Sequence, residues 1–187
     1  MRVAVVIPSL GRESLMQTIQ SLQGQEYDQL IVVKEGKNPA EARNMGLSMT
    51  EADIIAFIDD DVICHPDFIR QGKRFFEKHS EIDFMQGNVF GNIETLFPNR
   101  LFISANLWIR SGLHHFFDED LKSSEDLDFC WRLLDRNRLW GYNKDCKVWH
   151  PSDSHYEDWG VKNKDNTLLE MRHPKRYKKL MEEDMCL

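Results

Sequence analysis

The chain has 187 residues, of which 41% are hydrophobic and 29% are charged, and its net charge is −7. This length and composition are those of one globular domain around a single core. The negative charge argues against nucleic acid as a partner, because nucleic-acid binding requires a basic patch or stripe.

The sequence shows no apolar run long enough for a membrane helix, and we expect neither a signal peptide nor a transmembrane segment. The four cysteines are far apart and lack the paired spacing of zinc ligands: Cys64, Cys130, Cys146 and Cys186. Unpaired cysteines of this kind predict reduced thiols and a cytoplasmic protein.

The first part of the chain alternates strand and helix patterns. Runs of β-branched and other apolar residues predict three strands, at residues 2–7, 29–34 and 54–62. Apolar residues at helical spacing predict two helices between them, at residues 13–23 and 39–49. Asn38, Pro39 and Glu41 are typical of a helix start. This order predicts an α/β fold, with a doubly wound, mostly parallel central sheet flanked by helices.

The second part predicts further elements of both kinds. We expect helices at residues 66–79 and 123–136, strands at 82–90 and 101–109, a short strand at 146–149 and a helical tail at 166–185. The tail carries a basic cluster: Lys175, Arg176, Lys178 and Lys179. A solvated helix face explains this cluster better than peripheral membrane contact does.

Three carboxylates, Asp59, Asp60 and Asp61, end the third predicted strand, and the carboxyl edge of such a strand is where open α/β sheets bind ligands. In an extended chain Asp59 and Asp61 point to the same side. Adjacent carboxylates repel one another, and hard oxygen ligands favour Mg²⁺ or Mn²⁺. The alternative is an acidic turn that only ends the strand.

A second acidic pair, Glu125 and Asp126, opens the helix predicted at 123–136. Carboxylates in a first helical turn are also explained by capping and the helix dipole. The functional alternative is a general base that projects into the cleft; Asp128 is less well aimed for this role if Asp126 faces the cleft.

The remaining candidates are histidines and residues beside the first two strands. His150 follows the last short strand and could complete a metal site, and His155 competes for that role. Other groups suited to a nucleotide lie at the first strand, the second strand and the second helix: Pro8, Ser9, Arg12, Glu35 and Arg43.

Taken in order, the motifs of this chain resemble those of the family-2 nucleotide-sugar glycosyltransferases of GT-A fold, to about residue 151. They are Val6-Ile7-Pro8-Ser9 with Arg12, Ala42-Arg43-Asn44-Met45-Gly46-Leu47, Ile55-Ala56-Phe57-Ile58-Asp59-Asp60-Asp61 with Pro66-Asp67-Phe68, Asn106-Leu107-Trp108-Ile109-Arg110 before Phe117-Asp118-Glu119, Glu125-Asp126-Leu127-Asp128-Phe129-Cys130-Trp131-Arg132, and Val148-Trp149-His150. This sequence departs from the family's pattern after the second strand, where it has Lys34-Glu35-Gly36-Lys37 and the family usually has an acidic residue followed by Gly-Ser.

The resemblance implies a role for each matching position. Asp59 would contact the ribose or sugar, Asp60 the sugar, and Asp61 the metal, with Asp59 and His150 as further metal ligands. Asp126 would be the base, with Glu125 beside it. Residues 1–187 would form a single glycosyltransferase domain, with a nucleotide-binding half at 1–90, an acceptor or catalytic half at 91–151 and a C-terminal extension at 152–187.

The function implied is a metal-dependent, inverting transfer of a sugar to a hydroxyl of a carbohydrate or other acceptor. The donor would be a nucleoside-diphosphate sugar, with UDP favoured over GDP, and the cofactor Mn²⁺ or Mg²⁺. The alternatives are a nucleotide-sugar hydrolase, a nucleotidyltransferase, and a non-catalytic nucleotide-sugar-binding module. The sugar, acceptor, linkage and oligomeric state stay open.

Overall fold

The computed structural model describes residues 1–91, 102–113, 115–151 and 159–184. Its strands are β1 (Val3–Pro8), β2 (Gln29–Val33), β3 (Ile54–Phe57), β4 (Ile63–Cys64), β5 (Phe84–Gly91), β6 (Leu107–Arg110) and β7 (Trp140–His150). Its α-helices are α1 (Ser14–Ser21), α2 (Pro39–Met49), α3 (Phe68–Lys78), α4 (Glu125–Asp135), α5 (Trp159–Arg172) and α6 (Pro174–Asp184).

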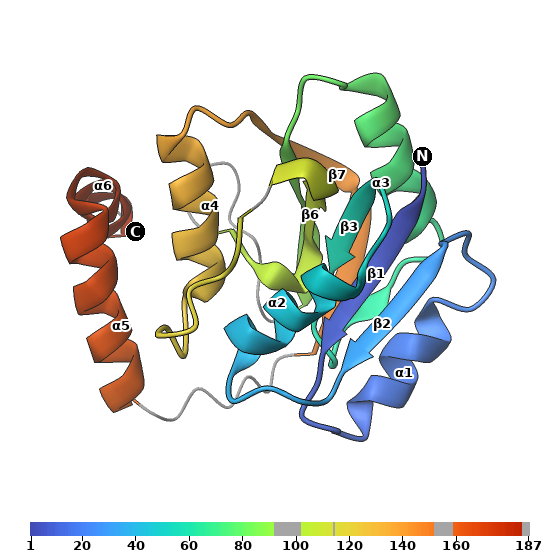
Figure 1. Cartoon of the computed structure of the whole chain (residues 1–187), viewed down its shortest axis with the longest axis horizontal. Coiled ribbons are helices and arrows are strands. Elements are labelled where there is room, and N and C mark those ends of the chain that lie inside the picture. The colour runs from blue at the N-terminus through green and yellow to red at the C-terminus, as the bar shows by residue number, and fades with distance from the viewer. Residues whose placement is uncertain (92–101, 114, 152–158, 185–187) are drawn as a thin grey trace.

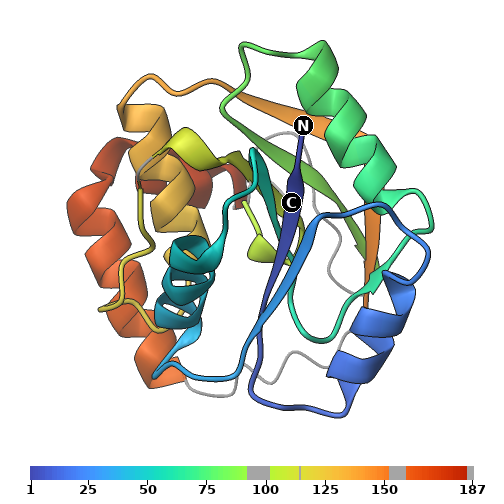
Figure 2. The same ribbon diagram turned by 45° about the vertical axis from the view of Figure 1, so that its right-hand side comes forward.

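The strands of these residues form one sheet in the order β2-β1-β3-β6-β5-β7-β4. Strands β1, β2, β3, β5 and β7 run in one direction, and β6 and β4 run against them. Helices α1 and α3 cover one face, and α2 and α4 cover the other (Figure 2). The predicted α/β class, with a mostly parallel sheet flanked by helices, is therefore confirmed.

The alternation of side chains along β1 explains the two core layers. Val3, Val5 and Ile7 face the layer under α1 and α3, whereas Ala4 and Val6 face the layer under α2 and α4, and all five are fully buried. A strand with both faces covered reads as a continuous apolar run, which is what the sequence shows. The two core layers thus hold β1 between β2 and β3, and its carboxyl end lies at the edge of the sheet where a ligand can bind.

Helix α2 begins where its sequence predicts. The side chain of Asn38 accepts a hydrogen bond of 2.9 Å from the backbone N–H of Glu41. The carboxylate of Glu41 in turn accepts from the backbone N–H of Lys37. The first contact satisfies an N–H group that the first helical turn cannot pair internally, and the second ties the residue before the cap to that turn.

Three predicted strands differ from the structure by more than two residues at one end. The strand expected at 54–62 ends at Phe57, and the chain turns at Asp60 and Asp61. In the segment expected as a strand at 101–109, residues 104–106 form a 3₁₀ helix and β6 begins only at Leu107. The strand expected at 146–149 is part of the much longer β7, because parallel pairing with β5 extends it.

The helical tail consists of two helices, α5 and α6, which lie beside α4 on the side away from the sheet (Figure 1). The helix breaks at His173, since Pro174 disfavours helical backbone in the residue before it. Leu169 of α5 packs against Leu127 and Trp131 of α4. No helix within the described ranges is long and apolar enough to cross a membrane.

The pairing at the far end of the sheet brings distant residues together. Strand β4 pairs antiparallel with β7, so that Ile63 lies opposite Trp149. This pairing places Asp61, two residues before Ile63, near His150 at the end of β7. Gly91 of β5 lies opposite His150 with a φ of +126°, and a Cβ there would come within 2.2 Å of the His150 carbonyl oxygen. Glycine is therefore required where β5 ends.

Candidate active site

A cleft of about 390 Å³ opens at the carboxyl ends of β1 and β3. All predicted binding, metal and catalytic residues other than His155 line it: Pro8, Ser9, Arg12, Glu35, Arg43, Asp59, Asp60, Asp61, Glu125, Asp126 and His150. His155 lies outside the described residues. The fold thus gathers candidates from six separate parts of the chain, while their individual roles stay predictions.

Asp59, Asp61 and His150 form a cluster with the donor atoms of a metal site. One potential ligand atom from each residue lies within 4.8 Å of the others. The Nε2 atom of His150 lies 3.4 Å from Oδ1 of Asp61. Asp59 and Asp61 were expected to point to the same side of an extended strand; in the structure they lie near each other beyond the end of β3, where the chain turns.

The hydrogen bonds around this cluster favour a cation. The Nδ1 atom of His150 lies 2.8 Å from the carbonyl oxygen of Pro151, which can only accept, so Nδ1 carries the proton in the neutral ring. The lone pair of Nε2 is then left facing Asp61. Oδ1 of Asp61 is buried and has no hydrogen-bond partner among the described residues. Two acceptors that face each other in a buried site fit a positive ion between them.

The negative charge of the cluster also affects protonation. Burial raises the pKa of Asp61, and its neighbours Asp59 and Asp60 raise it further, whereas His150 and Arg12 lower it. A bound divalent cation would offset the same repulsion. The residues present therefore fit a divalent metal ion.

Asp60 has a different environment from the other two aspartates of its motif. Its Oδ2 atom accepts hydrogen bonds from the Ser9 hydroxyl at 2.7 Å and from the Leu10 backbone N–H at 3.2 Å. The Ser9 backbone N–H itself donates to the carbonyl of Val33. Asp60 thus anchors the loop after β1 to the end of β3, a role that sequence reasoning missed.

Arg43 connects two parts of the cleft from helix α2. Its Nη2 donates to Asp59 at 2.9 Å, and its Nη1 donates to Glu125 of α4. The side chains of Arg43 and Glu125 are only 4% exposed. Burial raises the pKa of Glu125 to about 7, and the attraction of Arg43 opposes part of this rise. Arg43 therefore joins the cluster of Asp59, Asp61 and His150 to the acidic pair of α4.

Asp126 lies at the first turn of α4 with its carboxylate held in place. Oδ2 accepts from the backbone N–H and the hydroxyl of Ser104, at 2.9 and 3.2 Å, and Oδ1 accepts from the Leu127 N–H at 2.8 Å. Burial raises the pKa of Asp126, and Arg43 opposes this shift. Ser104 was missed because its segment was expected to be a plain strand.

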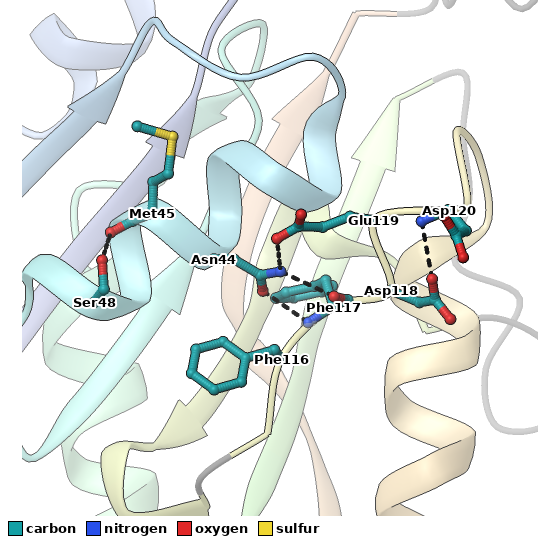
Figure 3. Close-up of a pocket in the computed structure, with 8 residues that line it drawn as sticks. All are labelled: Asn44, Met45, Ser48, Phe116, Phe117, Asp118, Glu119 and Asp120. Carbon is teal, nitrogen blue, oxygen red and sulfur yellow. Dashed lines mark hydrogen bonds between the residues drawn. The ribbon is translucent and has the colours of Figure 1, made fainter.

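A second, separate pocket of about 540 Å³ is lined by residues of α2 and of the loop before α4 (Figure 3). There the Asn44 side chain donates to the Phe117 carbonyl and to the Glu119 carboxylate, and its oxygen accepts from the Phe117 N–H. Asn38 also donates to the Glu119 carbonyl, at 2.7 Å. These contacts hold the loop before α4 against α2. None of the predicted site residues lines this pocket.

Asp128 does not line the cleft. It is fully buried, and its carboxylate contacts Arg132 at 2.7 Å, His173 at 3.3 Å and Arg172 at 3.4 Å. The side chain of Asp128 therefore holds the tail helices against α4, as an ion-pair network. This position agrees with the expectation that Asp128 is less well aimed at the cleft than Asp126, although no sequence signal indicated its contacts with the tail.

The model of the family described as Glycosyl transferase family 2 matches residues 11–140. The chain belongs to glycosyl transferase family 2. This membership confirms the resemblance seen in the motifs. Among curated family relatives, "Pre-mycofactocin glycosyltransferase" of Mycobacterium tuberculosis, strains CDC 1551 / Oshkosh and ATCC 25618 / H37Rv, is 27% identical over 152 residues, covering 66% of this chain. The chain spans 32% of the length of those relatives.

Solved structures share the fold of this family-2 chain. The crystal structure of S. aureus TarS 1-349 in complex with UDP-GlcNAc matches with a TM-score of 0.69 and 17% identity, over 91% of this chain and 67% of that one. The mannosyltransferase PcManGT from Pyrobaculum calidifontis, in complex with GDP-Man and Mn²⁺, matches with a TM-score of 0.66 and 10% identity, over 83% of this chain and 58% of that one. At these identities the likeness concerns the fold.

Proposed function

We propose that the cleft transfers a sugar from a nucleoside-diphosphate sugar to a hydroxyl group of a carbohydrate or other acceptor, with inversion at the anomeric carbon. The observation that carries this proposal is the cluster of Asp59, Asp61 and His150 in the same cleft as Asp126, in a chain of glycosyl transferase family 2. Family membership favours sugar transfer, and the cluster indicates where a diphosphate would bind.

Mn²⁺ or Mg²⁺ would be held by Asp61, Asp59 and His150. The unpartnered Oδ1 of Asp61 and the Nε2 lone pair of His150 support this assignment. Such an ion supplies positive charge beside the diphosphate, which becomes more negative as it leaves. PcManGT, which shares the fold, is described with GDP-Man and Mn²⁺.

The nucleotide would occupy the part of the cleft lined by residues 1–90, as proposed for the first half of a single domain. Glu35 follows β2 and would accept from a base N–H, while Pro8 ends β1 and Ser9 and Arg12 lie on the loop after it. We favour UDP over GDP, since TarS, a fold neighbour, is described with UDP and with UDP-GlcNAc.

Asp126 would act as the base from the second half, residues 91–151. Its carboxylate receives the proton of the acceptor hydroxyl as that oxygen forms a bond to the anomeric carbon. The bond from the anomeric carbon to the diphosphate oxygen breaks, and the diphosphate leaves with the electron pair. The raised pKa of Asp126 makes its carboxylate a stronger base than an exposed aspartate. The contacts from Ser104 and Leu127 hold it in one orientation.

A thermal-shift panel tests donor and metal together. We expect UDP or GDP, or one of their sugars, to raise the melting temperature by roughly 5–10 °C at about 100 times its Kd, with Mn²⁺ or Mg²⁺ but not with EDTA. Asp61→Asn should abolish the shift. Asp67→Asn is the matched control, because Asp67 does not line the cleft and pairs with Arg70. Equal shifts in both variants would overturn the assignment.

Product analysis then separates transfer from its alternatives. With a donor that binds, we expect a glycosylated acceptor whose anomeric configuration, measured by NMR, is opposite to that of the donor. Free sugar formed equally with and without acceptors would identify a hydrolase. Formation of a nucleotide sugar from a nucleoside triphosphate and a sugar phosphate would identify a nucleotidyltransferase. Donor binding with no turnover would identify a binding module.

A further inference from the structure

The two arginines of the cleft contact the acidic cluster in different ways. Arg43 is buried and is bound to two carboxylates, Asp59 and Glu125. Arg12 lies on the loop after β1, and its side chain is 47% exposed. Its Nη1 is 3.3 Å from Oδ2 of Asp61 and 3.8 Å from Oδ1 of Asp60. Both Nη atoms of Arg43 are thus bound to carboxylates, whereas the exposed side chain of Arg12 can move away from Asp61 into solvent.

The backbone around Arg12 is anchored, so that only its side chain can change contacts easily. The Ser9 hydroxyl donates to Asp60 and accepts from the Gly11 N–H at 2.9 Å, and the Leu10 N–H also donates to Asp60. These contacts fix the loop up to Gly11. The guanidinium group can therefore exchange partners by side-chain rotation while the loop stays in place.

We propose that Arg12 is an internal counter-ion of the metal cluster, which the diphosphate of the donor draws away from Asp61. Arg12 contacts one oxygen of Asp61, while the other oxygen, Oδ1, faces His150 without a hydrogen-bond partner among the described residues. A divalent ion bound there would lie near a positive charge, and this repulsion weakens the binding of the metal alone. The proposal rests on the proposed nucleotide and metal site.

A nucleoside diphosphate reverses this effect. Guanidinium groups bind phosphate oxygens through charge-assisted hydrogen bonds, so the diphosphate offers Arg12 a better partner than a solvent-exposed aspartate contact. Arg12 then attracts the donor, and the repulsion on the metal falls. Arg12 therefore makes metal and donor bind cooperatively, and by reciprocity each raises the affinity for the other by the same factor.

The test measures Mn²⁺ binding without nucleotide, and UDP and GDP binding at saturating Mn²⁺, by titration calorimetry. Arg12→Gln should raise the affinity for Mn²⁺ alone by about two- to fivefold, the range of a partly exposed ion pair. The same variant should lower the affinity for the nucleotide that binds by about tenfold or more, because a charge-assisted contact is lost. An opposite sign in the two measurements is the signature of the counter-ion role.

Two further variants complete the design. Arg70→Gln removes one positive charge from an exposed pair outside the cleft and should leave both affinities within twofold of the wild type. Arg12→Lys keeps the charge, so it should keep the weak affinity for Mn²⁺ alone, while it loses the forked contact to phosphate. Melting temperatures of all variants without ligand report whether each is folded.

The proposal would be overturned if folded Arg12→Gln bound Mn²⁺ alone with unchanged or lower affinity. It would also be overturned if Arg70→Gln raised the affinity for Mn²⁺ alone by as much as Arg12→Gln does. The failure of the proposed function gives a different result. If the wild type binds neither UDP nor GDP with Mn²⁺, the donor assignment fails. The Mn²⁺ affinities of the wild type and of Arg12→Gln, both measured without nucleotide, then still decide whether Arg12 acts as a counter-ion.

Discussion

Asp126→Asn is the most direct test of the proposed base, because the substitution keeps the shape of the side chain and removes its basicity. Three hydrogen bonds reach the carboxylate, two from Ser104 and one from Leu127. An asparagine whose oxygen faces Ser104 keeps the first two and places its NH₂ group against the Leu127 N–H. The expected loss is one hydrogen bond, about 1 kcal/mol of unfolding free energy. This corresponds to a fall of about 2–4 °C in melting temperature.

The expected loss of activity is much larger than the loss of stability. A positioned base contributes about 10²- to 10⁴-fold, which is about 2.7–5.5 kcal/mol of activation free energy. Steady-state transfer should therefore lose that factor in kcat at a temperature where the variant is fully folded. The Kd of the donor should stay within about threefold, since the base contacts the acceptor. The rate of the wild type should also fall as the pH drops through the raised pKa of Asp126, because only the carboxylate accepts a proton.

Asp120→Asn is the matched control, because Asp120 lies in the loop beside the second pocket and not in the cleft. It should keep full activity. A folded Asp126→Asn variant that keeps more than a tenth of the wild-type kcat would refute the reasoning. An equal loss of kcat in both variants would do so as well, because the effect would then not depend on the cleft.

Three further predictions concern buried groups. The pKa of Glu125 is raised in the folded state, so the stabilisation by its protonated form is complete below pH 4.5 and is lost as the pH rises to about 7. The free energy of unfolding of the wild type, relative to that of Glu125→Gln, should therefore fall by at most about 3 kcal/mol between pH 4.5 and about 8. Denaturant titrations that show a rise over this range would contradict the prediction. Arg43→Gln should lower the free energy of unfolding, measured in urea, by about 3–5 kcal/mol, because it leaves Glu125 buried without its partner. Adding Glu125→Gln should restore part of this loss. A loss below about 1 kcal/mol would show that the pair contributes little to stability. Gly72→Ala should lower the free energy of unfolding by about 1–3 kcal/mol, since the new Cβ would lie 2.3 Å from the buried ring of Trp108. Gly112→Ala is the control and should leave the melting temperature unchanged, because no atom lies within 4 Å of its Cβ position.

Local patterns predicted those elements whose own residues decide their structure. The start of α2 follows from Asn38, Pro39 and Glu41, whose side chains satisfy the first turn whatever the rest of the chain does. The apolar runs of β1 and β2 left little alternative to buried parallel strands.

Predictions were less accurate where distant partners decide the outcome. Strand β7 extends far beyond the apolar run at 146–149, because β5 supplies hydrogen bonds to polar residues such as Asn143 across an irregular register. The segment before β6 turns into a 3₁₀ helix at Ser104, and this turn delivers the donors that hold Asp126. Neither feature has a signal in the local hydrophobic pattern.

In the site, too, local sequence predicted some features and not others. Residue chemistry was enough to select carboxylates, a histidine and arginines as candidates, because few other side chains bind metals or phosphates. It could not tell that Asp60 anchors a loop, that Arg43 is bound to two carboxylates, or that Asn44 holds the loop before α4.

The sequence by itself determined the α/β class, the order of the first strands and helices, and the kinds of functional groups at the ends of the strands. These features depend on the alternation of apolar residues and on side-chain chemistry, which are local properties. Only the tertiary structure decided which groups meet. Asp61 and His150 come together because β4 pairs with β7, and Glu125 reaches Arg43 because α2 and α4 pack on the same face of the sheet. Contacts of this kind arise from packing between segments distant in the chain, and a local pattern carries no record of them.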